Sequence, residues 1–255
     1  MLIDSHAHIL SDVLDTNQII NSMKEEGLEK IITIGTNAEN SVEALNVAKN
    51  NKNIYAIVGL YPEYADQITK EDIDVIRRLA KEEKVVGIGE IGLDYHISKD
   101  NREKQINLFR KQLEIAAEND LPVCIHTRSA AEDTYQVLKE YAPKLKNKGV
   151  MHCFSENREY ALKFLDLGFY ISFSGNITYK KSDRSFLKDI PLDKILVETD
   201  SPYLSPEPLR GQPNIPARVK ITAQKIADEL CLDFDEFSKI TLENTYRLYK
   251  KMKRG

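Results

Sequence analysis

The chain has 255 residues, of which 42% are hydrophobic and 30% charged, and its formal net charge is −4. This composition can fill a large core, but it excludes tight nucleic-acid binding driven by overall charge. Any polyanionic substrate would have to be attracted by bound metals and by local Lys or Arg side chains. Three cysteines without zinc spacing, no long apolar run and no signal pattern at the start together predict a cytoplasmic protein without a membrane segment.

Short apolar runs alternate with amphipathic stretches along almost the whole chain. The apolar runs predict strands at residues 2–8, 30–36, 54–60, 85–90, 122–127, 149–153, 169–174 and 195–199. The stretches between them predict helices at 16–26, 40–50, 70–82, 101–119, 130–141, 157–166, 182–189 and 216–230. A closing helix is predicted from about residue 232, and a last helix from there to about residue 250. Eight strands, each followed by a helix, predict one α/β domain over 1–255, a (β/α)8 TIM barrel.

Two histidines, His6 and His8, lie two residues apart in the first apolar run. Side chains alternate along a strand, so both imidazoles are expected on the same face. A strand histidine is more often a hydrogen-bonded core residue than a ligand, and a pair alone cannot hold a catalytic metal. The other candidates also stand at the ends of predicted strands, and they are Glu90, His126, His152 and Asp200. Because the carboxyl ends of barrel strands meet at one face, the six side chains together predict a metal site there.

Residues 87–92 read GIGEIG and match the G-x-G-x-x-G pattern of dinucleotide-binding folds. In those folds a helix begins directly at the third glycine, so that its amino terminus meets the pyrophosphate. Here a polar loop is expected over residues 93–100 before the next helix begins. We therefore predict no dinucleotide site, and expect the glycines to let backbone and metal come close around Glu90.

The order His-x-His, Glu, His, His, Asp along successive strands is typical of amidohydrolase-type metal barrels. Within that class the sequence resembles the TatD-like deoxyribonucleases over nearly its full length. The blocks that carry this resemblance are DSHAH (4–8), GEIGLDY (89–95), PVCIHTR (122–128), HCFS (152–155), VETDSPYL (197–204) and LRGQPN (209–214).

This resemblance implies a metal-dependent hydrolase of DNA phosphodiester bonds, often a 3′-to-5′ exonuclease that acts on single strands or 3′ ends. Matched residue by residue, it implies a first divalent metal at His6, His8, Glu90 and Asp200, and a second at His126 and His152 with Glu90 bridging. Asp200 and Glu90 are the expected catalytic residues, and Asp200 is expected to accept the proton of a metal-activated water. No protein partner is expected.

The identity of the metals is an open point at the level of sequence. Members of the family are usually described as magnesium enzymes, yet magnesium prefers oxygen ligands and keeps several waters. Four imidazoles with two carboxylates favour zinc, nickel, cobalt or manganese. We expect a transition metal in the purified protein.

The sequence departs from the family pattern at three positions, where the family often has His, Gly and Glu but this chain has Tyr61, Glu156 and Ile215. None is an expected ligand, but Tyr61 and Glu156 should lie near the barrel mouth and affect substrate preference. Candidate substrate contacts are Arg128 for phosphate, and Tyr95, His96 and Tyr203 for stacking on a base.

Two other interpretations remain open. A lactonase, phosphotriesterase or amidase could use the same two-metal frame, although many of those enzymes bridge their metals with a carboxylated lysine where this chain has Glu90. A binding module whose metal only stabilises the barrel would instead lose thermal stability, and no reaction, when the metal is removed.

Overall fold

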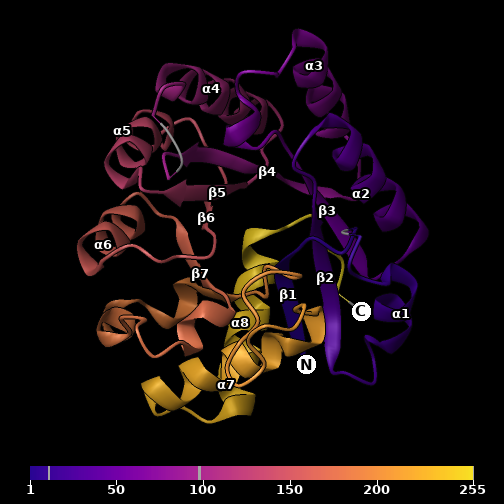
Figure 1. Cartoon of the computed structure of the whole chain (residues 1–255), viewed down its shortest axis with the longest axis vertical. Helices are drawn as coiled ribbons and strands as arrows, with labels where there is room; N and C mark the ends of the chain where they lie inside the picture. Colours follow the sequence, from indigo (N-terminus) through magenta and orange to yellow (C-terminus); the bar gives the residue numbers. More distant parts are fainter. Residues whose placement is uncertain (11, 97–98, 255) are drawn as a thin grey trace.

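The chain folds into a (β/α)8 TIM barrel, in agreement with the prediction from the sequence (Figure 1). The computed structural model describes residues 1–10, 12–96 and 99–254. Its strands form one parallel sheet in chain order, and they are β1 (Leu2–Ala7), β2 (Leu28–Ile34), β3 (Ile54–Val58), β4 (Val85–Asp94), β5 (Val123–Arg128), β6 (Gly149–Met151), β7 (Tyr170–Phe173) and β8 (Ile195–Val197). The α-helices are α1 (Thr16–Ser22), α2 (Ala38–Asn50), α3 (Lys70–Leu79), α4 (Arg102–Glu118), α5 (Ala131–Tyr141), α6 (Arg158–Asp166), α7 (Val219–Leu230) and α8 (Phe234–Leu248).

Short 3₁₀ turns occupy several of the remaining connections. They are η1 (Pro62–Tyr64), η2 (Gly175–Thr178), η3 (Ser185–Asp189), η4 (Leu192–Lys194) and η5 (Pro216–Arg218). Figure 1 shows helices α2 to α6 arranged around the outside of the strands. Among the described residues, no helix is both long and apolar enough to span a membrane.

The barrel closes where the chain leaves β8 and runs beside β1. Ala7 and Ser201 form a parallel bridge, and the backbone N–H of His8 donates to the carbonyl of Ser201 at 2.7 Å. The N–H of Asp200 donates to the carbonyl of His6 at 2.9 Å. The last strand of the barrel therefore delivers Asp200 next to the first strand, which carries His6.

The alternation of side chains along a strand separates two hydrophobic cores. On β2, Ile32 and Ile34 belong to the cluster inside the barrel, whereas Ile31 belongs to the larger cluster between strands and helices. The end of the chain completes the inner cluster, because Tyr249 and Met252 pack with the side chains that point inward from the strands. The amino end of the barrel is thus filled with apolar groups, and only the carboxyl end is left for chemistry.

Polar residues mark where the helices begin. Side chains accept hydrogen bonds from N–H groups in the first turn of five α-helices, and these caps are Asp15, Asn37, Thr69, Asn157 and Asp233. Thr69 and Asp72 form a reciprocal capping box. Each cap typically stabilises a helix by about 0.5–2 kcal/mol, so local sequence sets these boundaries.

Three sequence predictions of local structure are wrong. The predicted helix at 182–189 is only the short turn η3, because Arg184 donates instead to the carbonyls of Ile177 and Tyr179 and so folds the segment back on itself. One helix, α8, replaces the two helices that were predicted after residue 232. The loop predicted at 93–100 begins later, because β4 continues through Asp94, paired with β5.

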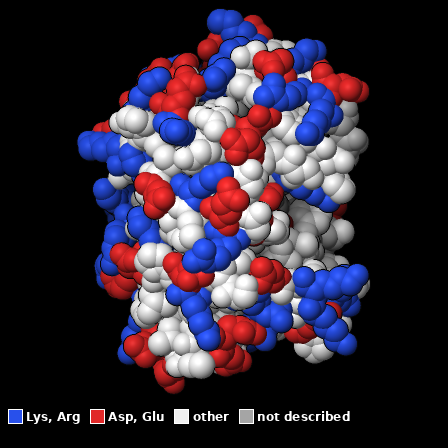
Figure 2. Space-filling view, turned by 90° about the vertical axis from the view of Figure 1, so that its left-hand side faces the viewer, with Lys and Arg blue, Asp and Glu red and all other residues white. Residues whose placement is uncertain are grey.

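Charged side chains of both signs are mixed on the face of the molecule that Figure 2 shows. The formal net charge of the whole chain is −4, so a polyanion would not be attracted by the overall charge of the molecule.

Candidate metal centre

The side chains that the sequence predicts as metal ligands meet at the carboxyl end of the barrel. A cavity of about 1080 Å³ opens there, and its lining includes His8, Glu90, His126, His152 and Asp200. His6 lies beneath them and is fully buried. Strands β1, β4 and β5 and the ends of β6 and β8 therefore converge on one site, as expected for a barrel.

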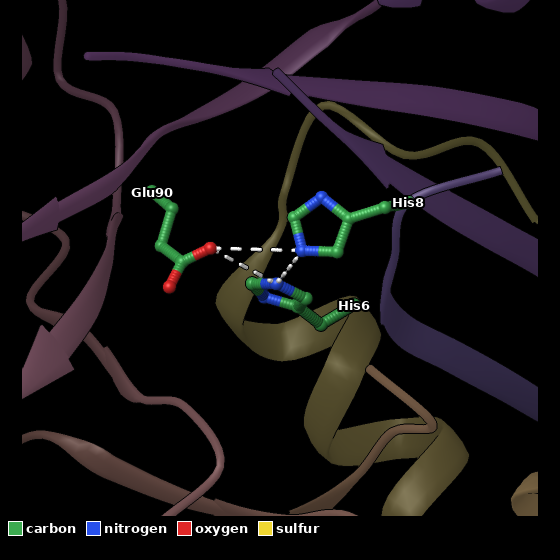
Figure 3. Close-up of side chains that lie close together, drawn as sticks. All are labelled: His6, His8 and Glu90. Atoms are coloured by element: carbon green, nitrogen blue, oxygen red, sulfur yellow. Dashed lines mark hydrogen bonds and ion pairs between the residues drawn. The ribbon is translucent and has the colours of Figure 1, made fainter. Parts of the chain in front are cut away.

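The first group of side chains surrounds Nε2 of His6 and Nε2 of His8, which are 3.2 Å apart. Oε2 of Glu90 lies 3.5 Å from the His6 nitrogen and 3.7 Å from the His8 nitrogen. Oδ1 of Asp200 lies 3.5 Å and 3.4 Å from the same two nitrogens. Figure 3 shows both imidazoles turning a ring nitrogen toward the Glu90 carboxylate.

These separations suit a bound metal ion. Ligand atoms at about 2.0–2.1 Å from a tetrahedral metal stand about 3.3–3.4 Å from one another. The five separations in the first group range from 3.2 to 3.7 Å, close to the edges of such a tetrahedron. Two imidazole nitrogens and two carboxylate oxygens are also a donor set that zinc and similar ions accept. The first group could therefore hold one divalent metal.

The second group is built on the other oxygen of the same carboxylate. Oε1 of Glu90 lies 2.9 Å from Nδ1 of His126 and 2.9 Å from Nε2 of His152. The His6 and His152 rings stack, with their centroids 4.0 Å apart, so the two groups are direct neighbours. Since each oxygen of Glu90 faces a different group, this carboxylate could bridge two metals.

Two further carboxylates contact the histidines of the second group at the ring nitrogen that does not face Glu90. Nε2 of His126 lies 2.9 Å from Oδ2 of Asp94, and Nδ1 of His152 lies 3.1 Å from Oε1 of Glu198. Each carboxylate fixes the ring orientation and leaves the opposite nitrogen directed at Glu90. Metal-binding histidines in proteins are commonly oriented in this way.

The histidines and carboxylates also shift one another's pKa values. Burial alone would raise the pKa of Glu90, but the facing histidines, chiefly His152, hold it well below its ordinary value. Burial would lower the pKa of His152, yet Glu90 and Glu198 raise it well above 6.5. For His6, burial and the neighbouring His152 lower the pKa. The lowered pKa of Glu90 favours its ionised form, which a metal ligand requires.

Asp200 owes its place to contacts made by its own backbone and by Asp4. The buried carboxylate of Asp4 accepts hydrogen bonds from both the backbone N–H and the hydroxyl of Thr199. Asp200 itself has a positive φ of 56°, which turns the chain sharply at the end of β8. Backbone strain of this kind clusters at functional sites, where the surrounding structure has to maintain it.

The glycines on either side of Glu90 allow β4 and β5 to pack closely, and they do not border the space where a metal would bind. A methyl group on Gly89 would lie 2.6 Å from Cβ and 2.8 Å from the carbonyl oxygen of Cys124 on β5. A methyl group on Gly92 would clash with the carbonyl oxygen of His126. We expected these glycines to make room for a metal, whereas the structure shows them making room for β5. Helix α4 begins only at Arg102, close to the start predicted at residue 101 and not at the third glycine of the GIGEIG run.

Three residues that contact this cluster were not among the predicted site residues. Asp94 and Glu198 orient the histidines, and the hydroxyl of Tyr61 lies 3.1 Å from Nε2 of His126 and 3.3 Å from Oδ2 of Asp94. The period of two could have identified the carboxylates, because Asp94 is four residues after Glu90 and Glu198 is two residues before Asp200. Tyr61 follows no such period, and only the comparison with the family pattern placed it near the barrel mouth.

The expected substrate contacts divide into two pairs. Arg128 and Tyr203 are exposed and line the cavity. Tyr95 is buried, and its hydroxyl donates to Asp133, so its ring is not available for stacking. His96 is exposed but does not line the cavity.

Tyr61 and Glu156, two residues at which the sequence departs from the family pattern, differ in their position relative to the cavity. Tyr61 lines the cavity, so this expectation of a place at the mouth is met. Glu156 does not line it, although its neighbour Ser155 does.

Comparison with known proteins gives a consistent result. The family model described as "TatD related DNase" matches residues 3–250. The chain is 39% identical over 254 residues to the uncharacterized metal-dependent hydrolase YabD of Bacillus subtilis, covering 98% of this chain and 99% of that protein. It is 33% identical over 243 residues to the 3′-5′ ssDNA/RNA exonuclease TatD of Erwinia tasmaniensis. This match covers 92% of this chain and 93% of that protein.

Among solved structures, the fold matches the crystal structure of YJJV, a TatD homologue from Escherichia coli K12. The TM-score is 0.92 at 32% identity, and the match covers 98% of each chain. The matches in sequence and in fold both extend over nearly the whole chain, including every strand that carries the cluster. The chain therefore belongs to the TatD family and is a metal-dependent hydrolase that acts on ester bonds.

Proposed function

We propose that this hydrolase is a two-metal nuclease that removes nucleotides from the 3′ end of single-stranded DNA. The observation that best supports two metals is the division of the Glu90 carboxylate, whose two oxygens face two different sets of histidines. Pairs of metals are a common device for displacement at phosphorus, because they stabilise both the attacking and the leaving oxygen.

In this proposal His6, His8, Glu90 and Asp200 would hold the first metal, and His126, His152 and Glu90 would hold the second. When bound, the metals would polarise the phosphodiester and lower the pKa of the attacking water. The donor set of four imidazoles favours zinc, manganese, nickel or cobalt over magnesium.

The side chains of the chain itself have three tasks. Asp200 accepts the proton of the attacking water through its carboxylate, which its neighbours keep ionised. Asp94 and Glu198 hold the imidazoles of His126 and His152 in the orientation that a ligand requires. The water oxygen bonds to phosphorus, the bond from phosphorus to the 3′ oxygen breaks, and that oxygen takes a proton.

Nucleic acid is the proposed substrate because a relative at 33% identity is named as an exonuclease for single-stranded DNA and RNA. The cavity is large enough for one nucleotide and has side chains suited to it. Arg128 is exposed, lines the cavity and makes no ion pair with another described residue, so its guanidinium is available to a phosphate. Tyr203 is 60% exposed and offers a ring on which a base can stack.

A direct test compares two single-stranded DNA molecules of one sequence, labelled at the 5′ end, with a free or an inverted 3′-3′ terminus. We expect the free strand to shorten stepwise from its 3′ end with release of nucleoside 5′-monophosphates, and the inverted strand to resist. Equal cleavage of both strands would show that cleavage does not start from the 3′ end. Turnover of a lactone or dipeptide with no cleavage of DNA or RNA would instead support another hydrolase on the same frame.

A further inference from the structure

The large hydrophobic side chains that remain exposed are concentrated at the cavity. Six such side chains are exposed in the described part of the chain, and three of them, Val13, Tyr64 and Tyr203, line this one cavity. Their exposed fractions are 61%, 38% and 60%. Exposed apolar groups gathered in this way mark a binding surface rather than a solvated one.

These three side chains come from one half of the barrel mouth. They lie in the connections after β1, β3 and β8, and β8 is next to β1 because the barrel closes there. Tyr203 lies against the ring of His8 at 5.9 Å, and Tyr64 lies against the ring of Tyr61 at 6.3 Å. Neither exposed phenol makes a hydrogen bond to any residue that the structure describes. Each ring thus contacts one neighbouring ring edge to face at the border of the site, and its hydroxyl has no hydrogen-bond partner among the described residues.

The same half of the mouth carries carboxylates. Asp12 and Glu63 line the cavity, are exposed, and make no ion pair within the described residues. The opposite half, built by the connections after β4 to β7, contributes Arg128. A nucleic-acid strand has a negative charge on every phosphate, so it is repelled by the first half and attracted by the second.

We propose that the half with the tyrosines is a terminal-nucleoside subsite, formed by Tyr64, Tyr203, Asp12 and Glu63. This inference rests on the proposed nuclease function. The subsite binds the 3′-terminal nucleoside of a single strand, whose 3′-hydroxyl carries no phosphate. The base stacks on the tyrosines, and the phosphate that will be cleaved reaches Glu90 and the histidines. The rest of the strand leaves past Arg128. The subsite favours single strands, because a base in a duplex must first be unpaired and unstacked before it can meet the rings.

The carboxylates also determine which end of the strand fits. Breaking the bond between phosphorus and the 3′ oxygen releases the terminal nucleotide with its 5′-phosphate and leaves a 3′-hydroxyl on the shortened strand. Each turnover from the 3′ end therefore regenerates a neutral end, which Asp12 and Glu63 tolerate. Digestion from the 5′ end with the same bond broken would leave a 5′-phosphate for the next turnover, and the carboxylates would repel it.

Binding is tested with tryptophan as a reporter, because the chain contains none. Tyr203→Trp places a single indole in the subsite, and Leu192→Trp places one at an exposed position before β8, at the opposite end of the barrel. The probe is a short single-stranded DNA with a phosphorothioate at its last linkage, added to the metal-loaded protein. We expect stacking to quench the Tyr203→Trp fluorescence in a saturable way and to leave Leu192→Trp unchanged. Equal quenching of both variants, or of neither, would overturn the proposal.

Selection of the end is tested in the same titration and by hydrolysis. A 3′-phosphate on the probe should weaken binding to Tyr203→Trp by at least about threefold, and the added changes Asp12→Asn and Glu63→Gln should remove most of that difference. In hydrolysis, Tyr203→Leu with Tyr64→Leu should lower kcat/KM by at least about fivefold for a strand with a normal 3′-terminal base. For a strand with an abasic 3′ end, the same double change should alter kcat/KM little.

These outcomes separate the subsite from the proposed function. A wild-type protein that cleaves no nucleic acid contradicts the function, while the fluorescence titration still decides whether the subsite binds a nucleoside. If the wild type is active but the tyrosine variants slow normal and abasic strands equally, the nuclease function stands and the subsite is wrong.

Discussion

Nε2 of His126 lies 2.9 Å from Oδ2 of Asp94, on the side of the ring opposite to the nitrogen that faces Glu90. The two residues are brought together by the pairing of β4 with β5, in which Asp94 stands opposite Arg128 and Gly92 opposite His126. Asp94 is itself buried, so its contact with the imidazole is shielded from water. The carboxylate therefore fixes which nitrogen of His126 is free to bind a metal.

Asp94→Asn should weaken the second metal site and leave the first nearly unchanged. The amide keeps the shape of the side chain but loses the charge that makes His126 a better ligand, and such changes typically cost about 10- to 100-fold in metal affinity. Zinc titration in the presence of a competing chelator measures both sites. Asp66→Asn is a matched control, because Asp66 is exposed and pairs only with surface groups. Equal affinities for wild type and Asp94→Asn would show that Asp94 has no part in the site.

Replacing His6 and His8 together by Ala should remove one metal per chain and abolish hydrolysis. The two nitrogens are 3.2 Å apart and supply half of the proposed ligands of the first metal. The second site depends on other residues, so one metal should remain. Elemental analysis of the purified variant measures this, with His96→Ala as the control histidine outside the cavity. Full metal content in the double variant would mean that the assignment of ligands is wrong.

The stability of the metal-free protein should fall as the pH rises, whereas the stability that metal adds should increase. Burial lowers the pKa of His8, His126 and His152, but the surrounding carboxylates outweigh it and raise all three above 6.5. A raised pKa in the folded state contributes stability that is complete below about 6.5 and is lost as pH rises through the folded-state value. Metal binding instead requires neutral imidazoles, so the stability that metal adds should increase over the same range.

Urea unfolding at several pH values between about 6 and 8, in chelator and in excess zinc, measures this difference. We expect the gap in unfolding free energy between the two conditions to widen as the pH rises. A gap that is constant with pH would show that these histidines do not release protons when the metal binds.

Gly92→Ala should destabilise the protein more than Gly27→Ala. Both glycines have positive φ angles, 142° and 77°, but a methyl group on Gly27 meets no atom within 4 Å, whereas one on Gly92 collides with the carbonyl of His126. The control thus shows the cost of a positive φ without a collision, and the additional loss at Gly92 combines its less accessible φ of 142° with the collision. We expect a difference of about 2 kcal/mol or more in the free energy of unfolding, with loss of metal from the second site. Equal effects of the two changes would mean that β5 can move without cost.

The sequence predicted the barrel and the residues of the cluster because both follow from short-range regularities. An apolar run sets each strand, and the residue that ends the run faces the barrel mouth, as Glu90 and Asp200 do. The alternation of side chains then places His6 and His8 together. These inferences need no knowledge of which strands are neighbours.

Other features depend on neighbours that the sequence does not reveal. β4 continues to Asp94 because β5 offers pairing partners beyond Glu90, and only that pairing sets Asp94 behind His126. Tyr95 resembled a stacking residue by its position, but the extended strand directs it to Asp133 instead. The segment 182–189 has the composition of a helix, yet Arg184 uses its donors to hold a turn.

The most direct test of the proposed site is the rate of hydrolysis by Asp200→Asn. The amide keeps the shape and one coordinating oxygen, but it removes the charge and the proton acceptor. Asp228→Asn, on the exposed side of α7, is the matched control. With single-stranded DNA at saturating metal, we expect kcat to fall by about 100-fold or more, with binding of substrate largely retained. A loss of less than about threefold would contradict a catalytic role for Asp200 and the proposed mechanism.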